Sequence, residues 1–355
     1  MKKNKDTFNG RIRAVKGKLK RQGLDALIVS EPRDMEYLTG FSCEGSRLLV
    51  LPERDPVYFI DTMNVSLAEK ALRGVRLADI VPGRIFPELR AFMRETRIKK
   101  TGVRESSFTV PEFRALGGDK GGFRILDAAA LIADMRQVKS ALETALIRRA
   151  AFETVKIWRR FKKQVEPGMK ESDMARIIDT MIREKGLINS FPTIAASGPN
   201  TAYPHWVPSD RKVRPGELVL VDFGVRYGGY CSDLTRVLSV GRIDRQIRGL
   251  KDLVAEAQEA AIKRIKPGIS IGALAFYINS ILVKNGAGAY ILHSLGHGVG
   301  LDVHEKPSLR EGVDSRLKKG MVVTVEPGLY KKGLGGVRVE DMVLVTEKGC
   351  EVLTV

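Results

Sequence analysis

An internal repeat constrains the fold of this 355-residue chain more than any other feature. The segments VEPGMKESDMARIIDTMIREKG (165–186) and IKPGISIGALAFYINSILVKNG (265–286) share an early Pro-Gly turn and a final glycine, at an offset of 100 residues. Ile178 matches Ile278, and the apolar positions around them fall on the same helical face in both copies. A glycine after the last turn is a common helix C-cap. The repeat therefore predicts two related units, each with a helix that buries one face.

The repeat continues into strands that carry carboxylates. GELVLVDFG (216–224) aligns with GMVVTVEPG (320–328), which places Asp222 opposite Glu326. Strict alternation along a strand puts Asp222 on the same face as two leucines. The presence of an acid in this apolar row calls for an explanation. We therefore expect two α+β units packed about a pseudo-twofold axis, whose strands face a shared site.

A glycine-rich turn and a second carboxylate follow each of these strands. YGGY (227–230) precedes Asp233 and KKGLGG (331–336) precedes Glu340, so both returning strands are expected to bring an acid beside the first one. Two like charges about 4 Å apart cost on the order of 4 kcal/mol at an effective dielectric near 20. Two divalent cations would cancel four such charges, as in many hydrolytic sites. Pairing with arginines on solvated strands explains one such acid more easily than four at symmetric positions.

Histidines are concentrated near these acids. HSLGHGVGLDVHE (293–305) holds three of the four in the chain, which are His293, His297 and His304. Its glycines predict an extended segment rather than a helix, and Ser294 stands where an HExxH zinc motif needs glutamate. His205 lies in NTAYPHWVPSD, upstream of the first carboxylate strand. Imidazoles in such a site act as metal ligands or as proton donors.

These segments resemble the pita-bread metallopeptidases, and within them the proline-specific branch of Xaa-Pro dipeptidase (prolidase) and aminopeptidase P. The similarity runs through FPTIAASGPNTAYPHWVPSD, LVLVDFGVRYGGYCSDLTR, LGHGVGLDVHE, VVTVEPGLY and GGVRVEDMVLVTEKG, while DMEYLTGF resembles the creatinase-type N-terminal domain of that branch. The resemblance implies hydrolysis of the bond N-terminal to proline, in Xaa-Pro dipeptides or at the N-terminus of longer peptides. Trp206, where many relatives have glycine, and FSCEGS (41–46) depart from the family pattern, so substrate length stays open.

The resemblance also implies residue roles. Two divalent ions, manganese first with cobalt or zinc as alternatives, would be held by Asp222, Asp233, His297, Glu326 and Glu340. Asp233 and Glu340 would bridge both ions, and Glu326 would also help to deprotonate the attacking water. Substrate binding and polarisation, or proton transfer to the leaving nitrogen, would fall to His205, His293 and His304. Arg338 would support the site, and the family resemblance implies a homodimer.

The N-terminal part is predicted to be a separate domain. Residues 1–133 would form a creatinase-like α/β domain and residues 134–355 the catalytic domain. Strand-like runs alternate there with helical patterns at 65–72 and 86–95; the runs are 26–30, 47–52, 56–61, 100–105 and 123–128. From Ala129 to about Lys163 the pattern predicts helix almost without a break.

The net charge of +18 raises the possibility of nucleic-acid binding. The first 21 residues contain nine Lys or Arg, and residues 136–163 contain another nine. Neither stretch matches a nucleic-acid-binding module, so both are predicted to be solvated helix faces and nucleic acid is not the expected partner. No apolar run approaches the roughly 20 residues of a membrane span, and no signal segment follows the basic start. A cytoplasmic protein with no membrane partner is expected. Reduced thiols are expected at Cys43, Cys231 and Cys350, which show no CxxC spacing.

Two alternatives stay open. A catalytically silent protein of this fold could use its basic surface for nucleic acid or protein partners, but silent relatives generally lose metal ligands and this chain keeps all five positions. Creatinase-like or lyase-type chemistry on the same fold is disfavoured because creatinases lack the full metal set.

Overall fold

The computed structural model describes residues 5–72, 74–118 and 122–355. The chain divides into two compact units, Met1–Met135 and Arg136–Val355. The boundary falls inside helix α6 (Ala129–Gln137), two residues beyond the division predicted at residue 133.

The first unit is built around a six-stranded mixed sheet with the order β4-β3-β2-β1-β5-β6. The five predicted strands and the two predicted helices are confirmed. The sequence did not reveal β4, whose residues are mostly exposed or half-buried and form no apolar run. Its elements are α1 (Lys5–Gln22), β1 (Ala26–Val29), α2 (Pro32–Thr39), β2 (Arg47–Val50), β3 (Val57–Asp61), α3 (Val65–Ala71), β4 (Arg76–Ile80), α4 (Ile85–Glu95), β5 (Lys100–Val103), α5 (Val110–Leu116) and β6 (Arg124–Asp127).

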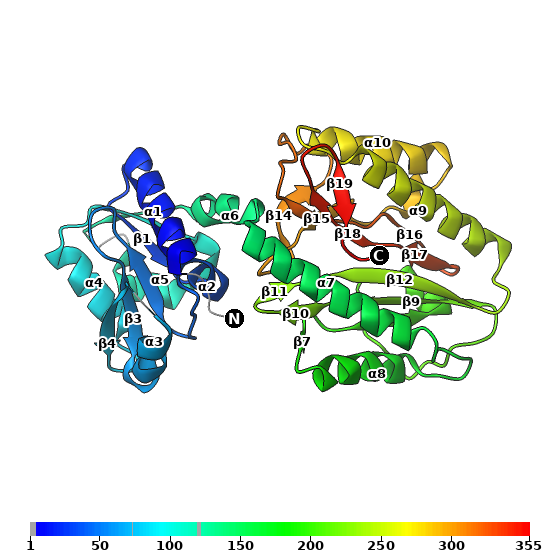
Figure 1. Cartoon of the computed structure of the whole chain (residues 1–355), viewed down its shortest axis with the longest axis horizontal. Coiled ribbons are helices and arrows are strands. Elements are labelled where there is room, and N and C mark those ends of the chain that lie inside the picture. Colours follow the sequence, from blue (N-terminus) through cyan, green and yellow to red (C-terminus); the bar gives the residue numbers. More distant parts are fainter. Residues whose placement is uncertain (1–4, 73, 119–121) are drawn as a thin grey trace. The chain divides into compact units, whose positions relative to one another are not determined.

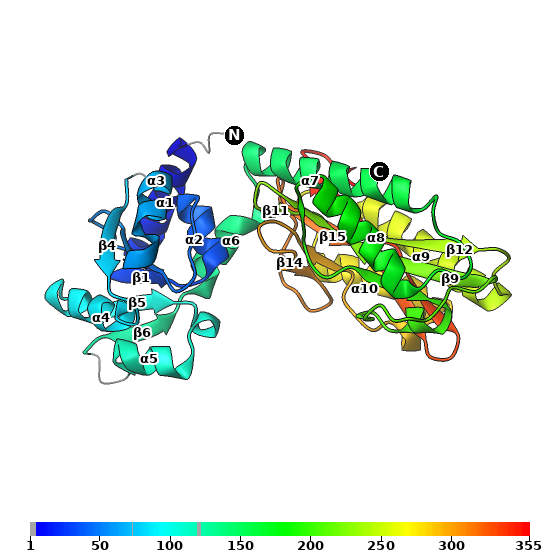
Figure 2. The same ribbon diagram turned by 90° about the horizontal axis from the view of Figure 1, so that it is seen from below.

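Helices cover both faces of this sheet. Ala26 and Ile28 of β1 pack in one cluster with Leu89 and Met93 of α4. Figure 2 shows α4 and α5 on one side of the sheet and α1 and α2 on the other. Because neither face is solvated, β1 and residues 48–50 of β2 are continuous apolar runs rather than alternating ones.

The helix predicted almost without a break from Ala129 to about Lys163 is confirmed, with one interruption at 138–140 that divides it into two helices. α7 (Ala141–Phe161) starts anew after α6. Its N-cap is Ser140, whose side chain accepts a hydrogen bond from the backbone N–H of Glu143, while the Glu143 side chain accepts from the N–H of Ser140. This capping box fixes a helix start inside the apolar pattern.

The residues between these two helices turn inward. The backbone N–H of Lys139 donates to the carbonyl oxygen of Gly320 over 2.8 Å. The side chains of Arg136 and Lys139 are buried, so the prediction of a solvated cationic face over 136–163 is wrong at these two positions. Their partners lie far away in the sequence and leave no local signal.

The second unit contains two copies of one α+β motif, as the repeat predicted. α8 (Glu171–Glu184) and α10 (Ile271–Lys284) keep the offset of 100 residues. Gly186 and Gly286 follow them with φ of 66° and 73°, the left-handed conformation of a glycine C-cap. The other elements are β7 (Ile188–Asn189), β8 (Ile194–Ser197), β9 (Glu217–Phe223), β10 (Val225–Tyr227), β11 (Tyr230–Cys231), β12 (Leu234–Val240), α9 (Arg245–Arg264), β13 (Gly296–Gly298), β14 (Glu305–Leu309), β15 (Val322–Val325), β16 (Gly328–Lys331), β17 (Gly335–Arg338), β18 (Asp341–Val345) and β19 (Cys350–Val352).

The strands of this unit lie between α8 and α10 (Figure 1). The sheet β12-β9-β8 belongs to the first copy and the sheet β14-β13-β15-β18-β19 to the second. In each copy the carboxylate strand pairs antiparallel with the strand that follows its glycine turn, β9 with β12 and β15 with β18. The predicted hairpins are therefore confirmed.

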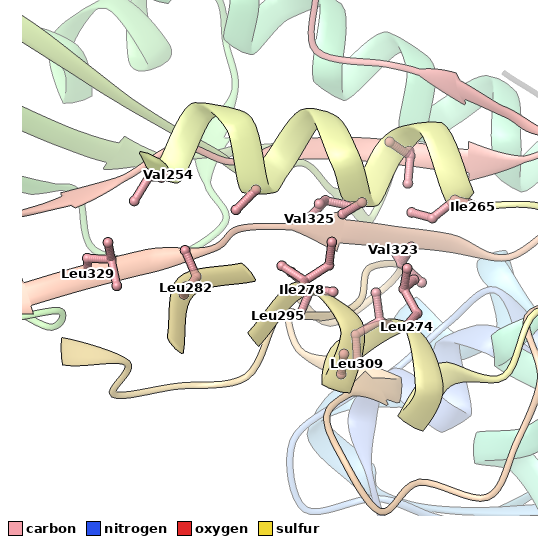
Figure 3. Close-up of a cluster of buried hydrophobic side chains, with 14 of the residues drawn as sticks. Val254, Ile265, Leu274, Ile278, Leu282, Leu295, Leu309, Val323, Val325 and Leu329 are labelled. Carbon is pink, nitrogen blue, oxygen red and sulfur yellow. The ribbon is translucent and has the colours of Figure 1, made fainter. Parts of the chain in front are cut away.

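Apolar side chains hold the helices on these sheets. In the second copy Ile278 of α10 and Val254 of α9 are fully buried in one cluster with Val323 and Val325 of β15 (Figure 3). This rigid support fixes the strands that carry the site. None of the helices in the described part of the chain combines the length and apolar character that crossing a membrane requires.

Candidate metal centre

The first copy contributes two buried aspartates. Asp222 lies in β9 directly opposite Thr235 of β12, and Asp233 comes immediately before β12. Their exposed fractions are 8% for Asp222 and 4% for Asp233. The antiparallel return predicted from the glycine turn therefore brings both acids into the same buried region.

The second copy contributes two buried glutamates. Glu326 follows β15, and Glu340 lies between β17 and β18 with an exposed fraction of 1%. The backbone N–H of Glu340 donates to the carbonyl oxygen of Thr235 over 3.1 Å, and the hydroxyl of Thr235 donates to the carboxylate of Glu340 over 2.7 Å. Thr235 thus joins the two copies at the centre of the unit.

His297 lies between acids of the two copies. Its Nε2 is 3.1 Å from Oε1 of Glu326 and 3.8 Å from Oδ2 of Asp233. Its Nδ1 lies 3.1 Å from the carbonyl oxygen of Gly298, which suits an Nδ1–H donor and leaves Nε2 facing the acids. Ligand atoms of Asp233, His297 and Glu340 all lie within 4.8 Å of one another, close enough to bind one metal ion together.

Burial and mutual repulsion perturb these acids. Burial, and then the charge of Glu340, raises the pKa of Asp233 well above its ordinary value. Burial and the charge of Glu326 do the same to the pKa of Glu340. Burial also raises the pKa of Asp222, and the attraction of Arg338 opposes it only in part. These carboxylates are therefore under-compensated by the protein itself.

Glu326 behaves in the opposite way. Burial alone would raise its pKa, but the hydrogen bond and charge of His297 outweigh burial and lower it to about 2. Burial would likewise lower the pKa of His297, and Glu326 outweighs it and raises that pKa. In the absence of metal, each partner therefore stabilises the ionised form of the other.

Arg338 and Tyr330 form a support that spans both copies. Arg338 donates to Oδ2 of Asp222 over 2.5 Å, to the hydroxyl of Thr235 over 3.0 Å and to the hydroxyl of Tyr330 over 2.7 Å. The Tyr330 hydroxyl lies 2.8 Å from Nε2 of His293, and Nδ1 of His293 lies 2.8 Å from the carbonyl oxygen of Ser294. Sequence reasoning missed Tyr330 and Thr235, although both follow a predicted ligand within four residues.

This network sets the state of His293. Because Tyr330 accepts from Arg338, its own proton is free to be donated to Nε2 of His293, which places the imidazole proton on Nδ1. Burial raises the pKa of Tyr330 to about 12, so the hydroxyl keeps that proton. Burial also lowers the pKa of His293, which favours the neutral ring.

The site opens into a cavity of about 780 Å³. All nine residues singled out from the sequence line it, namely His205, Asp222, Asp233, His293, His297, His304, Glu326, Arg338 and Glu340. The rings of His297 and His304 stack edge to face with centroids 4.1 Å apart. His205 and His304 are exposed to this cavity, whereas His293 and His297 are half-buried. The remaining wall is largely apolar and includes Phe191, Pro192, Trp206, Val207 and Val303.

Trp206 is fixed in that wall. Its indole N–H donates over 2.8 Å to Glu171, a fully buried carboxylate at the start of α8. Glu171 also accepts hydrogen bonds from Ser197, Asn200 and Ser209. The segment that carries His205 is thus anchored by one buried acid.

The donor set fits divalent metal ions. The buried oxygens Oδ1 of Asp222 and Oδ1 of Asp233 have no hydrogen-bond partner among the described residues. Buried carboxylate oxygens left unpaired are costly, and a cation satisfies both their charge and their lone pairs. Carboxylates with one imidazole suit manganese, cobalt and zinc.

Two protein-family models match the chain. Residues 145–347 match metallopeptidase family M24, and residues 11–138 match the creatinase/prolidase N-terminal domain. The chain is 31% identical to the Xaa-Pro dipeptidase of Pyrococcus furiosus over 332 residues, which is 93% of each chain.

Solved structures of Xaa-Pro peptidases are also similar to this chain. The Xaa-Pro dipeptidase from Bacillus anthracis matches with a TM-score of 0.92 and 30% identity over 98% of this chain and 97% of that one. The X-Pro aminopeptidase from Thermotoga maritima matches with a TM-score of 0.84 and 30% identity over 95% of this chain and 97% of that one. Dipeptidases and an aminopeptidase are thus similar to it at equal identity.

Proposed function

Because the chain belongs to metallopeptidase family M24, with a creatinase/prolidase N-terminal domain and the pita-bread fold, we propose that it hydrolyses peptide bonds N-terminal to proline with two divalent metal ions. Relatives named Xaa-Pro dipeptidase and X-Pro aminopeptidase support this substrate class. The substrate would be an Xaa-Pro dipeptide or the N-terminal Xaa-Pro of a longer peptide.

The observation that carries the proposal is the set of buried acids. The pKa values of Asp233 and Glu340 are raised well above the ordinary range by burial and by neighbouring acids. Asp222 and Asp233 each keep a buried oxygen with no partner among the described residues. Repulsion among buried carboxylates does not stabilise a fold, so a purely structural role does not explain them. Bound cations would relieve this repulsion.

We propose that Asp233 and Glu340 would help to hold both ions. Asp222 would complete the coordination of one ion, and His297 with Glu326 that of the other. Manganese is the first candidate. When bound, such ions polarise the scissile carbonyl and lower the pKa of water.

The chain's own residues would supply the rest. Glu326, whose pKa is lowered to about 2, is ionised and can accept a proton from water. Arg338 orients Asp222 by a direct hydrogen bond. His304 and His205, exposed to the cavity, would contact the substrate carbonyl or donate a proton to the leaving nitrogen. His293, held through Tyr330, would keep a fixed tautomer in the substrate site.

A proline substrate would suit the apolar wall of the cavity. An Xaa-Pro amide is tertiary, offers no N–H to a backbone acceptor and carries a ring that needs an apolar pocket. Phe191, Trp206 and Val303 supply apolar surface in the same cavity as the acids.

The direct test is hydrolysis of peptides. The protein purified with Mn²⁺ should cleave Gly-Pro or an Xaa-Pro-Pro peptide, and comparing the two would show whether the enzyme is a dipeptidase or an aminopeptidase. Asp233→Asn should lower kcat/KM by about 10³-fold or more, because the ions supply several kcal/mol of transition-state stabilisation. Asp252→Asn, an exposed aspartate on α9, is the matched control and should leave kcat/KM unchanged. Equal cleavage by the wild type and Asp233→Asn would refute the proposal.

We further propose a cytoplasmic homodimer that does not use nucleic acid as a partner. The silent-binding alternative predicts a different result, in which the protein binds RNA tightly at physiological salt and hydrolyses no peptide. The retention of acids at both copies of the repeat favours hydrolysis.

A further inference from the structure

Glu305 is a partly buried charged residue at the wall of the cavity, and the proposed reaction does not use it. It follows His304 directly and begins β14. Oε2 accepts from Arg136 over 2.6 Å, and Oε1 accepts from the ammonium of Lys139 over 2.7 Å. Arg136 also donates to Asp302 over 2.7 Å. Two cations and two acids thus form one network, here called the Glu305 network.

Burial separates this network from ordinary surface ion pairs. The exposed side-chain fractions are 1% for Lys139, 5% for Arg136 and 9% for Glu305, while Asp302, at 37%, is the exposed member. Exposed ion pairs contribute little, whereas a buried pair fixes its members because breaking it strands a desolvated charge. The chain also interrupts a helix between α6 and α7, where Lys139 turns inward.

The Glu305 network packs against the turn that precedes His304. A Cβ added at Gly300 would lie 2.3 Å from Oε1 of Glu305, so the carboxylate fills the space above that backbone. The carbonyl oxygen of Gly300 accepts from the backbone N–H of Cys231 over 2.7 Å. Cys231 is fully buried and lies two residues before Asp233. The turn therefore connects Glu305 to a proposed metal ligand.

The same carboxylate is also tied to the imidazole strand. Glu305 pairs with Gly298 across the β13–β14 ladder, and Gly298 follows His297. A Cβ at Gly298 would lie 2.9 Å from the carbonyl oxygen of Glu305, so the strands meet there without a side chain between them. His304, His297 and the Asp233 segment are all positioned around one residue.

We propose that Glu305, clamped by Arg136 and Lys139, is a positioning residue that holds the 299–304 turn so that His304 faces the reacting peptide. This inference rests on the proposed function, because it assigns the support of the same site. Glu305 touches no substrate in this scheme and acts through His304.

A double-mutant cycle tests the action through His304. Measured on whichever Xaa-Pro peptide the wild type cleaves best, Glu305→Gln should lower kcat by about tenfold or more, with metal content and KM little changed. Glu305→Gln combined with His304→Ala should be no slower than His304→Ala alone, within about threefold. Losses that multiply in the double variant would overturn the proposal. Lys139→Arg should keep the activity that Lys139→Met loses, and Glu347→Gln, in an exposed ion pair with Lys319, is the matched control.

Thiol reactivity tests the same network without any substrate. N-ethylmaleimide modification of the full chain, followed by peptide mass spectrometry, should show Cys231 protected in the wild type and modified about tenfold faster in Glu305→Gln. Cys43, which belongs to the first unit, serves as the internal reference. An unchanged Cys231 rate in a folded Glu305→Gln variant would overturn the proposal. If the wild type cleaves no Xaa-Pro peptide but Cys231 is still modified faster in Glu305→Gln, the proposed function fails while the positioning by Glu305 stands.

Discussion

The two copies of the repeat share their frame and differ in their chemistry. α8 and α10 occupy matching segments, and each buries an isoleucine at the same place, Ile178 in one and Ile278 in the other. At the first helical position, however, Glu171 of α8 corresponds to Ile271 of α10. The frame is set by turns and apolar faces common to both copies, so the polar residues are free to diverge toward separate tasks.

Equivalent acids show the same divergence. Asp222 and Glu326 hold matching positions, yet burial raises the pKa of Asp222 whereas His297 lowers the pKa of Glu326 to about 2. Among the described residues, only the strand acid of the second copy, Glu326, has an imidazole within hydrogen-bonding distance. The acids are duplicated and the imidazoles are not, which gives one site two unlike halves.

Substituting the second acid of either copy should have the largest effect. Asp233→Asn and Glu340→Gln should each lower kcat/KM by about 10³-fold or more and reduce bound metal, because both acids would be shared between the ions. The measurement is kinetics together with metal analysis of the purified variants. If one variant kept activity within tenfold of the wild type, the two halves would not contribute equally.

Making the first copy resemble the second at the helix start should destabilise the protein. Glu171→Ile removes the acceptor for Ser197, Asn200, Trp206 and Ser209, and should lower the free energy of unfolding by about 3 kcal/mol. Urea denaturation measures it. Glu184→Gln, at the exposed end of the same helix, is the control. A loss below about 1 kcal/mol would show that these donors find other partners.

In metal-free protein the pKa of Glu326 should also be shifted in the opposite direction from the pKa of Asp233. Asp233 keeps its proton to higher pH in the folded state than its ordinary pKa of 3.8. The contribution of Asp233 to the free energy of unfolding is therefore full at low pH and is lost as pH rises through the raised pKa. Glu326 contributes to the free energy of unfolding at pH values above its ordinary pKa of 4.5. This contribution is lost as pH falls toward about 2.

Chelated protein should therefore lose unfolding free energy as pH rises above about 4.5, since Glu340 behaves as Asp233 does. Urea denaturation from pH 5 to 8 checks this, and added Mn²⁺ should remove the decline. Stability that rises over this range without metal would contradict the pKa directions.

The smallest effect is expected on the exposed face of α10. Phe276, 64% exposed, corresponds to Arg176 of α8, so Phe276→Arg should change the free energy of unfolding by no more than about 0.5 kcal/mol. Urea denaturation at low protein concentration measures the change. A loss above about 1.5 kcal/mol would show that this face is covered in the folded protein.

The sequence predicted what short-range patterns encode. The repeat predicted α8, α10 and the paired hairpins, because helix periodicity and strand alternation are local. The convergence of Asp222 and Asp233 followed from a glycine turn between them. The edge strand β4 escaped notice because it is exposed and carries no apolar run.

Contacts between distant residues escaped prediction. Lys139 and Glu305 are 166 residues apart, and nothing near Lys139 distinguishes it from the solvated cations of α7. Tyr330 and Thr235 support the site through Arg338, which required knowing that the two copies meet. Packing across the repeat, rather than any motif, creates these links.

Anomalous diffraction from crystals grown with Mn²⁺ tests whether bound cations make the buried acids tolerable. We expect two manganese peaks about 3.5 to 4 Å apart, enclosed by Asp222, Asp233, Glu326 and Glu340 with His297. Full occupancy of the wild type beside loss of both peaks in Asp233→Asn would support the dinuclear site. A single peak, or none among these side chains, would contradict it.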